Sequence, residues 1–381
     1  MIVRVIRLGA VCMLAVVAIG CAGGHPDPGP PLPAAPLERV VQRLFLIGDA
    51  GEPDPAGEPV LMALERDVRS QASPAMIVFL GDNIYPDGMP AAGAADRDQA
   101  EQRLQAQMDV ALESGARGLF VPGNHDWHGD GLDQVRRQGA YITEHGGDLV
   151  AHVPEAGCPG PRTIDLGSRL RLVALDTQWW LHGGLRPEGE DSGCEAGSEA
   201  DVRRLLAAAL DSAGDRDVIV IAHHPLLSGG PHGGHFTWKD HLFPLTKLAG
   251  WAWVPLPGIG SIYPLWRKFG GTTQDLASSK YEHMLDVIED VLAEFAPLAY
   301  AAGHEHSLQV LGGDSARYVL VSGCGYYGNE EPIGTRDETL YAGAAAGYMR
   351  LDVPEQGPAR LAVLVVDAGG GAREAFSQYL E

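Results

Sequence analysis

The sequence predicts an α/β fold in which helices flank layered β-sheets, and three observations predict it. Short apolar runs rich in Val, Ile and Leu recur along the chain, and several lack alternation, as is typical of strands buried on both faces. Segments with apolar residues at 3.6-residue spacing lie between some of these runs and predict helices. Polar motifs follow several runs directly, which places them at the carboxyl ends of strands, where open α/β sheets bind ligands.

The two periodic patterns predict the elements in chain order. Apolar runs predict strands at residues 44–47, 76–80, 118–121, 170–175, 218–222, 298–302 and 318–322. Helical spacing with charged faces predicts helices at residues 59–70, 96–113, 199–213 and 279–295. Two further strand-like runs, at residues 347–353 and 361–366, are expected to complete a second sheet. We therefore expect one domain at residues 40–367 and a C-terminal tail at residues 368–381.

The length and charge of the chain limit its partners. At 381 residues the chain can bury a large core, and 45% hydrophobic with 20% charged residues is ordinary for a globular protein. A formal net charge of −22 argues against a nucleic-acid polymer or an anionic membrane surface as partner. A phosphorylated substrate would need local cations to attract it, and bound metal ions are the obvious source.

The first residues predict export. Arg4 and Arg7 precede a short apolar stretch, so residues 1–20 are predicted to be a signal peptide. Residues 18–21, Ala-Ile-Gly-Cys, resemble a bacterial lipobox, and Cys21 is therefore predicted to be lipidated. Residues 21–39 are rich in Pro, Gly and Ala and predict a tether. The predicted location is the periplasmic side of a bacterial outer membrane; a plain secretory signal or an uncleaved membrane anchor is the alternative.

Five short motifs carry metal-binding side chains, and each follows an apolar run. They are GDAG at 48–51, GDNIY at 81–85, GNHD at 123–126, VIAH at 220–223 and GHEH at 303–306. Carboxylates can hold two cations close together and imidazoles suit Fe, Zn and Mn. The motifs therefore predict a two-metal hydrolytic centre built from seven residues: Asp49, Asp82, Tyr85, Asn124, His223, His304 and His306.

In these motifs the chain resembles the calcineurin-like metallophosphoesterase superfamily, and within it the purple acid phosphatases, over residues 40–367. The resemblance implies a two-sheet metallophosphoesterase sandwich flanked by helices. It also implies that Asp82 bridges two metal ions. The implied ligands are Asp49, Asp82, Tyr85 and His306 for the first metal, and Asp82, Asn124, His223 and His304 for the second.

A paired departure indicates the purple acid phosphatase type. Most of the superfamily opens with Asp-x-His, but Gly51 stands at that histidine position, while Tyr85 follows Asp82 by three residues as in the GDxxY pattern of purple acid phosphatases. A phenolate is a hard anionic donor that favours Fe(III). The resemblance thus implies Fe(III) with a divalent Fe, Zn or Mn. The alternative is that Tyr85 is a loop residue that stacks on the site.

The resemblance implies an exported phosphohydrolase that cleaves phosphomonoesters by attack of a metal-bound hydroxide. Its partner would be a small phosphorylated substrate and no nucleic-acid polymer, and it would meet the membrane through its N-terminal lipid anchor. A phosphodiesterase or nucleotide phosphohydrolase with the same metals is one alternative. A non-catalytic interaction protein on the same scaffold is another.

Further polar residues receive roles near the metals. The resemblance implies that His125 and His232 are catalytic residues that face the substrate, with His232, nine residues after His223, as the group that protonates the leaving oxygen. His235 is a rival for that role. Asp126 is expected to orient His125.

The remaining histidines and cysteines receive structural roles. His224 is expected to be a filler beside Pro225, and the other histidines, at 128, 145, 152, 182, 241 and 283, are expected to be surface or satisfied core residues. Because export permits disulfides, Cys158 and Cys194, both in Gly- or Pro-rich loops, are predicted to pair. Cys324 follows an apolar run and is predicted to be a buried free thiol.

Residues 229–277 form a predicted insertion with four tryptophans, many Pro and Gly residues and little periodicity. Three interpretations are open. Its aromatic residues, with the flanking Lys247, Arg267 and Lys268, could lie at a membrane interface. It could be a lid over the site, or a loop folded onto its own core.

Overall fold

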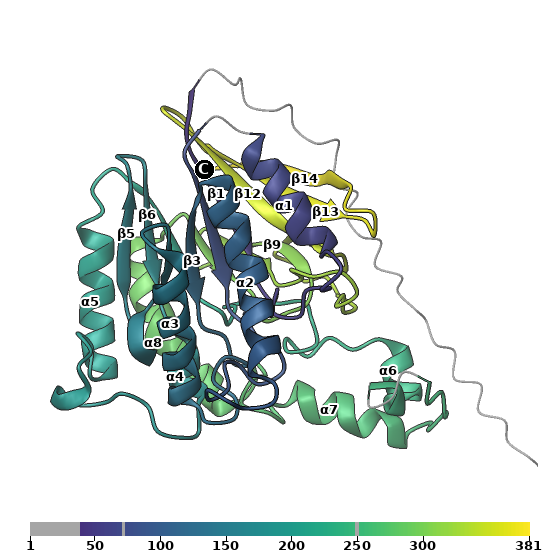
Figure 1. Ribbon diagram of the computed structural model, residues 1–381. Helices are drawn as coiled ribbons and strands as arrows, with labels where there is room; N and C mark the ends of the chain where they lie inside the picture. The colour runs from purple at the N-terminus through teal and green to yellow at the C-terminus, as the bar shows by residue number, and fades with distance from the viewer. Residues whose placement is uncertain (1–38, 71–72, 248–250) are drawn as a thin grey trace, which may run out of the picture.

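Two seven-stranded β-sheets pack face to face and helices cover their outer faces, so the predicted α/β fold is confirmed (Figure 1). The computed structural model describes residues 39–70, 73–247 and 251–381. The predicted signal peptide, Cys21 and nearly all of the predicted tether lie outside the described residues.

The first sheet has the strand order β14-β13-β12-β1-β2-β3-β4. Its strands are β1 (Val40–Ile47), β2 (Ala75–Leu80), β3 (Arg117–Val121), β4 (Val150–His152), β12 (Gly347–Pro354), β13 (Ala359–Val366) and β14 (Ala372–Leu380). Strands β1 to β4 are parallel. The three C-terminal strands continue the sheet beyond β1 in antiparallel register.

The second sheet has the strand order β11-β9-β10-β8-β7-β6-β5. Its strands are β5 (Arg162–Leu166), β6 (Leu170–Ala174), β7 (Asp217–Ile221), β8 (Ala299–Ala302), β9 (Leu308–Gly312), β10 (Tyr318–Ser322) and β11 (Thr339–Gly343). Strands β6, β7, β8 and β10 are parallel. Strands β5, β9 and β11 pair antiparallel with their neighbours.

Eight α-helices occur in the described part of the chain. They are α1 (Pro59–Arg69), α2 (Arg97–Ser114), α3 (Leu132–Gly146), α4 (Gln178–Leu181), α5 (Glu199–Asp211), α6 (Trp238–Leu242), α7 (Ile262–Lys268) and α8 (Ser279–Phe295). Helices α1, α2 and α3 pack on the first sheet, and α4, α5 and α8 pack on the second. Four short 3-10 turns lie at Glu155–Gly157, Glu190–Ser192, Pro244–Lys247 and Ile259–Ser261.

Strand β1 shows why the apolar runs lack alternation. Phe45 and Ile47 join the cluster between the first sheet and its helices, whereas Leu44 and Leu46 join the cluster between the two sheets. Successive side chains of a strand point to opposite faces, so a strand covered on both sides needs apolar residues at every position. Strand β1 is thus held on both faces, and Asp49 lies two residues after its end.

Two expectations about the C-terminal region are wrong. Strands β12 and β13 do not complete a second sheet: β12 pairs with β1, and the second sheet comes from the middle of the chain. Residues 368–381 are not a tail, because β14 pairs with β13 along its length and buries Leu380. The sequence of β14, AREAFSQYL, has few aliphatic residues because it is a half-exposed edge strand, and such strands give a weak apolar signal.

The fold gathers five loops at one end of the two sheets. These loops follow β1, β2, β3, β7 and β8, whose parallel directions bring their carboxyl ends together. Within the described residues, no helix combines the length and the apolar character needed to cross a membrane.

Candidate metal centre

The five loops bring all seven predicted ligands together. In chain order the ligands follow these strands: Asp49 after β1, Asp82 and Tyr85 after β2, Asn124 after β3, His223 after β7, and His304 and His306 after β8. Most of these side chains are buried. They divide into two sets on either side of Asp82.

The first set surrounds the phenol of Tyr85. Its hydroxyl lies 3.0 Å from Oδ1 of Asp49, 3.2 Å from Oδ2 of Asp82 and 3.2 Å from Nε2 of His306. Nε2 of His306 is in turn 3.5 Å from Oδ1 of Asp49. These four residues are the ones implied for the first metal.

The second set surrounds the amide oxygen of Asn124. Nε2 of His223 lies 2.9 Å from Oδ1 of Asn124, and Nδ1 of His304 lies 3.0 Å from the same oxygen. The two imidazole nitrogens are 3.3 Å apart. Nε2 of His223 also lies 3.5 Å from Oδ1 of Asp82. Asp82 therefore turns one carboxylate oxygen to each set.

The hydrogen bonds behind the imidazoles support a fit to metal ions. Nδ1 of His223 lies 2.8 Å from the carbonyl oxygen of Leu80, and Nε2 of His304 lies 3.0 Å from that of Gln274. Each ring must donate its proton to that carbonyl, which leaves a lone pair on the opposite nitrogen. Both lone pairs point at the Oδ1 acceptor of Asn124. Three acceptors that converge without a proton form a set of ligands for a cation.

The backbone holds three of the ligands in an uncommon conformation. Asp49, Asp82 and His304 have positive φ angles of 55°, 52° and 70°. This left-handed region is costly for residues with a Cβ atom, about 1–3 kcal/mol each, and such strain concentrates at functional sites. The packing beneath the ligands is also close: a Cβ atom on Gly81 would collide with the ring of His223.

Negative charge dominates the first set. Burial raises the pKa of Tyr85 well above its usual range, and Asp49 and Asp82 raise it further. Burial lowers the pKa of His306, but its hydrogen bond to Asp49 and the charges of Asp49, Glu331 and Asp82 outweigh burial and raise the pKa to about 9. Acidic neighbours contribute to both shifts, and bound cations would neutralise this negative charge.

The predicted role of Asp126 is wrong. Its carboxylate accepts hydrogen bonds from the backbone N–H groups of Asn83, Ile84 and Gly123, and no hydrogen bond of the described structure joins it to the ring of His125. Asp126 thus holds the loop that presents Asp82. The ring of His125 is instead held by Nδ1, 2.5 Å from the carbonyl oxygen of Pro86, and lies 4.5 Å from the ring of Tyr85.

His232 lies against the second set. Its ring centre is 4.1 Å from that of His304. Its Nδ1 lies 3.0 Å from the carbonyl oxygen of Gln274, 3.2 Å from Oδ1 of Asp275 and 3.0 Å from Nη2 of Arg267. The predicted insertion therefore supplies the residues that fix this ring.

His235 and His224 differ from the ligands. A Cβ on Gly334 would meet the ring of His235, so this histidine packs on the 334 loop. Atoms of His224, His223 and His304 lie within 4.8 Å of one another, which by distance alone resembles a metal site. However, both ring nitrogens of His224 contact protein oxygens, Oγ1 of Thr177 at 2.8 Å and Oε1 of Gln274 at 2.7 Å. His224 therefore supports the centre from behind.

Sequence reasoning missed three residues that hold the site. The carbonyl oxygen of Gln274 is within hydrogen-bond distance of ring nitrogens of His304 and His232. The carboxylate of Asp275 forms an ion pair with Arg267. Glu305, between the two histidine ligands of GHEH, accepts hydrogen bonds from Ser228 and from the backbone of Gly233. It thereby supports the loop that carries His232. Of the three, only Glu305 could have been found from the sequence, because it lies inside the GHEH motif.

Some of the structural roles predicted from the sequence are confirmed and others are wrong. Cys158 and Cys194 form a disulfide, with Cα atoms 5.6 Å apart. Cys324 is a buried free thiol, as predicted. His152 is not a satisfied core histidine: it is buried, and neither ring nitrogen has a hydrogen-bond partner within the described chain. The four tryptophans of the insertion are exposed, so it is not simply a loop packed onto its own core.

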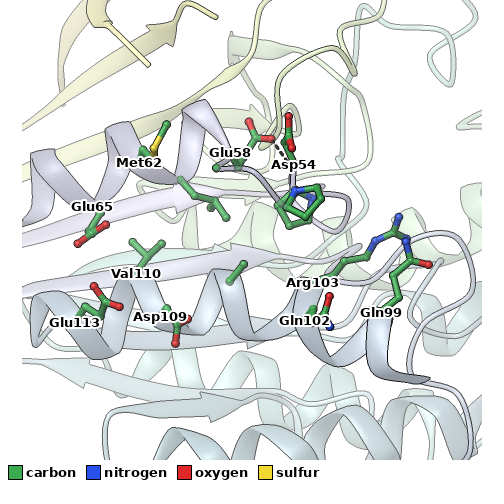
Figure 2. Close-up of a pocket in the computed structure, with 15 residues that line it drawn as sticks. Asp54, Glu58, Met62, Glu65, Gln99, Gln102, Arg103, Asp109, Val110 and Glu113 are labelled. Carbon is green, nitrogen blue, oxygen red and sulfur yellow. Dashed lines mark hydrogen bonds between the residues drawn. The ribbon is translucent and has the colours of Figure 1, made fainter. Parts of the chain in front are cut away.

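A separate cavity of about 460 Å³ lies between α1 and α2 (Figure 2). Carboxylates dominate its charged lining, namely Asp54, Glu58, Glu65, Asp109 and Glu113. None of the seven predicted ligands lines it, and its charge would repel a phosphate. Its one cation, Arg103, pairs with Glu52 and donates a hydrogen bond to the carbonyl oxygen of Tyr85 at 2.5 Å. The cavity therefore adjoins the support of Tyr85 but is not a phosphate site.

Comparisons with known proteins identify a family and similar folds. The family model described as Calcineurin-like phosphoesterase matches residues 42–308. No curated protein matches the sequence.

Three solved structures are similar to this chain, and the first two, with TM-scores above 0.5, share its architecture. GAP50, the anchor in the inner membrane complex of Plasmodium, is 15% identical with a TM-score of 0.54, covering 89% of this chain and 88% of that one. The purple acid phosphatase PPD1 of yellow lupin is 14% identical with a TM-score of 0.52, covering 90% of this chain but 54% of the lupin chain. A dimetal phosphatase from Danio rerio is 14% identical with a TM-score of 0.49, covering 89% and 98%. At these identities the likeness concerns the fold.

Proposed function

The chain belongs to the calcineurin-like phosphoesterase family, and from this premise we propose that it is an exported, metal-dependent phosphomonoesterase of the purple acid phosphatase type. The observation that carries the proposal is the division of donor atoms by Asp82, whose Oδ2 faces Tyr85 and whose Oδ1 faces His223. One bridging carboxylate between two donor sets is what a pair of cations requires.

We assign the ligands as the motifs implied. Asp49, Tyr85 and His306 hold one ion, Asn124, His223 and His304 hold the other, and Asp82 is shared. When bound, such a pair supplies Lewis acidity toward the phosphate and the attacking water. The hydroxyl of Tyr85 lies among carboxylates that raise its pKa, and only a strongly acidic cation would draw off its proton. We therefore propose Fe(III) at the first position and divalent Fe, Zn or Mn at the second.

The histidines above the metals serve the substrate in this proposal. Because Nδ1 of His232 is occupied by Gln274 and Asp275, Nε2 is the nitrogen that would meet a substrate oxygen and protonate the leaving group. His125, whose backbone N–H donates to Oδ1 of Asp82 at 2.8 Å, presents its ring beside Tyr85 and would contact the phosphate.

The experiment that tests the function combines metal analysis with a substrate panel. We expect about two metal ions per chain, including iron, and hydrolysis of small phosphomonoesters faster than of diesters or nucleotides. Preferential hydrolysis of a diester would replace the monoesterase proposal with the alternative that uses the same centre. Metal-loaded protein that is inactive on the whole panel would indicate a non-catalytic scaffold.

Export and lipidation form a separate part of the proposal. They rest on Arg4, Arg7 and the Ala-Ile-Gly-Cys sequence that ends at Cys21. More than one acyl chain gives stable anchoring, and lipidation of Cys21 would supply it. Mass spectrometry of the mature N-terminus should find an acylated Cys21, and Cys21→Ser should remove the acyl groups without changing the metal content. An unmodified N-terminus after signal cleavage would leave a plain secretory signal.

A further inference from the structure

Exposed apolar side chains concentrate in one part of the insertion. Nine of the fifteen exposed large hydrophobic residues of the described chain lie between residues 238 and 269. They are Trp238, Trp251, Trp253, Val254, Ile259, Ile262, Leu265, Trp266 and Phe269. Scattered exposed hydrophobic residues are ordinary, but such a concentration of them in one segment is typical of an interaction site. We call these nine residues the aromatic face.

Helix α7 shows that the exposure is organised. Ile262, Leu265, Trp266 and Phe269 follow one another at helical spacing and are 65%, 46%, 52% and 76% exposed. In a globular protein such a stripe normally faces the core. Here the opposite side of the helix is fixed to the body instead.

A polar contact fixes that inward side. Arg267 forms a double contact with the fully buried Asp275, with Nε–Oδ1 and Nη2–Oδ1 distances of 2.7 and 2.6 Å. The guanidinium also donates to the hydroxyl of Tyr263. The apolar stripe of α7 is therefore turned outward by a specific interaction on the other side of the helix.

The charge of the insertion is opposite to that of the chain. Residues 229–277 contain four basic residues, Lys239, Lys247, Arg267 and Lys268, and two acidic residues, Asp240 and Asp275. Both acidic residues are buried, whereas Lys239 and Lys268 are exposed beside the aromatic face. The insertion therefore has a formal charge of +2 and the rest of the chain −24, and helices α6 and α7 project from the body of the sheets (Figure 1). Because charges beyond roughly 8 Å are screened at physiological ionic strength, the local charge governs what this face attracts.

We propose that the aromatic face docks on a phospholipid bilayer that contains anionic headgroups. Tryptophan is favoured at the boundary between headgroups and acyl chains, and lysines beside it attract anionic lipid. The insertion exposes both tryptophans and lysines, and no carboxylate in the described part of residues 229–277 is exposed. The same insertion contacts His304 and His232 through Gln274, so docking would also fix the orientation of the metal centre relative to the bilayer.

Tryptophan fluorescence provides a local test that does not depend on how the N-terminus is anchored. Four of the seven tryptophans, Trp238, Trp251, Trp253 and Trp266, belong to the aromatic face, and the other three are buried. Full-length protein is mixed with vesicles of phosphatidylethanolamine and phosphatidylglycerol whose phosphatidylglycerol has brominated acyl chains, which quench tryptophan on contact. We expect strong quenching relative to vesicles without bromine. Quenching no stronger than with vesicles without bromine would overturn the proposal. This is also the result expected if the face joins two copies of the protein instead.

A pair of triple variants makes the test specific. Ile262→Ser/Leu265→Ser/Phe269→Ser removes three apolar anchors but keeps every tryptophan, and should weaken the quenching interaction by roughly tenfold or more. The matched control, Met62→Ser/Leu185→Ser/Leu340→Ser, removes three exposed apolar residues outside the insertion and should be quenched like the unmodified protein. Equal quenching of the two variants would show that the apolar stripe of α7 does not hold the protein on lipid and would overturn the proposal.

Discussion

The backbone N–H of Tyr85 donates a hydrogen bond to the carbonyl oxygen of Gly51 at 3.1 Å, so the two residues of the paired departure are in direct contact. A Cβ atom on Gly51 would lie 2.5 Å from the carbonyl oxygen of Asp82 and 2.7 Å from the backbone of Asn83 and Ile84. The loop that carries Tyr85 therefore fills the space in which a side chain at position 51 would lie. The exchange of a histidine for a tyrosine has a steric basis here.

Tyr85→Phe is expected to abolish a visible absorption band. If Fe(III) binds the first set, the phenolate is the group that gives a ligand-to-metal charge-transfer colour, and phenylalanine keeps the ring but removes the donor. Absorption spectra and iron content of the purified protein measure the effect. Tyr326→Phe is the matched control, since its ring lies 6.1 Å from that of Tyr85 but outside the donor set. A colourless, fully active protein with two Mn or two Zn ions would make Tyr85 a loop residue.

Asp82→Ala is expected to impair both metal positions at once. Its two oxygens face different donor sets, so its loss should lower metal content at both and reduce activity by more than about 100-fold, beyond the roughly 10–100-fold typical of outer partners. Metal analysis and phosphatase assays of the same sample provide the measurement. Asp109→Ala, in the carboxylate-lined cavity, should change neither. Normal metal content in Asp82→Ala would reject the bridging role.

Asp275→Asn tests whether the insertion positions His232. Asp275 holds Arg267, and both lie within 3.2 Å of Nδ1 of His232, so the weaker amide contact should let the ring move. We expect a fall in kcat of roughly 10–100-fold, with KM and metal content changed less. Asp240→Asn, which alters the capping box of α6 in the same insertion, is the control for a purely structural effect. Equal losses in the two variants would argue against positioning.

The strands and ligands could be predicted because their signals are local. Strand β1 is apolar at successive positions because both faces are covered, and Asp49 follows it directly. Helix α3 was not predicted although it buries Val135, Tyr141 and Ile142 on one face: it contains Gly139, and its N-cap residue, Gly131, has no side chain to mark the start. Strand β14 was missed because an edge strand needs fewer apolar residues.

The supports of the site could not be predicted because their partners are distant in sequence. Gln274 meets His224 fifty residues away, through the docking of the insertion, and no local pattern encodes that contact. Asp126 stands beside His125, which suggested that it orients the ring, but its carboxylate is satisfied by backbone N–H groups of the 83–84 loop. Adjacency in sequence is a poor guide to a hydrogen-bond partner in a turn.

Removal of the Cys158–Cys194 disulfide is expected to destabilise the fold. The bond closes a loop with a sequence separation of 36, and the chain-entropy model gives roughly 3–4 kcal/mol for a loop of that size. Urea unfolding of Cys158→Ser/Cys194→Ser under oxidising conditions measures the loss, and unmodified protein under reducing conditions should show the same midpoint. Unchanged stability in both would mean that the bond constrains little in the unfolded chain.

His152 is expected to make the fold sensitive to mild acid. Burial lowers the pKa of this histidine from 6.5 to about 4, and its ring nitrogens find no hydrogen-bond partner among the described residues. The unfolded chain therefore binds a proton more readily than the folded chain between these pH values. The free energy of unfolding should be highest above pH 6.5 and fall as the pH drops toward about 4, by roughly 3 kcal/mol from this group.

His152→Leu should remove that dependence, because leucine fills a similar volume and cannot be protonated. Denaturant unfolding at a series of pH values measures it: the difference in free energy between variant and unmodified protein should grow in favour of the variant as the pH falls from 6.5 toward about 4. His283→Leu, at an exposed histidine paired with Glu199, is the control for loss of one imidazole. Parallel pH curves for His152→Leu and the unmodified protein would show that the buried ring gains its proton as easily in the folded chain as in the unfolded one.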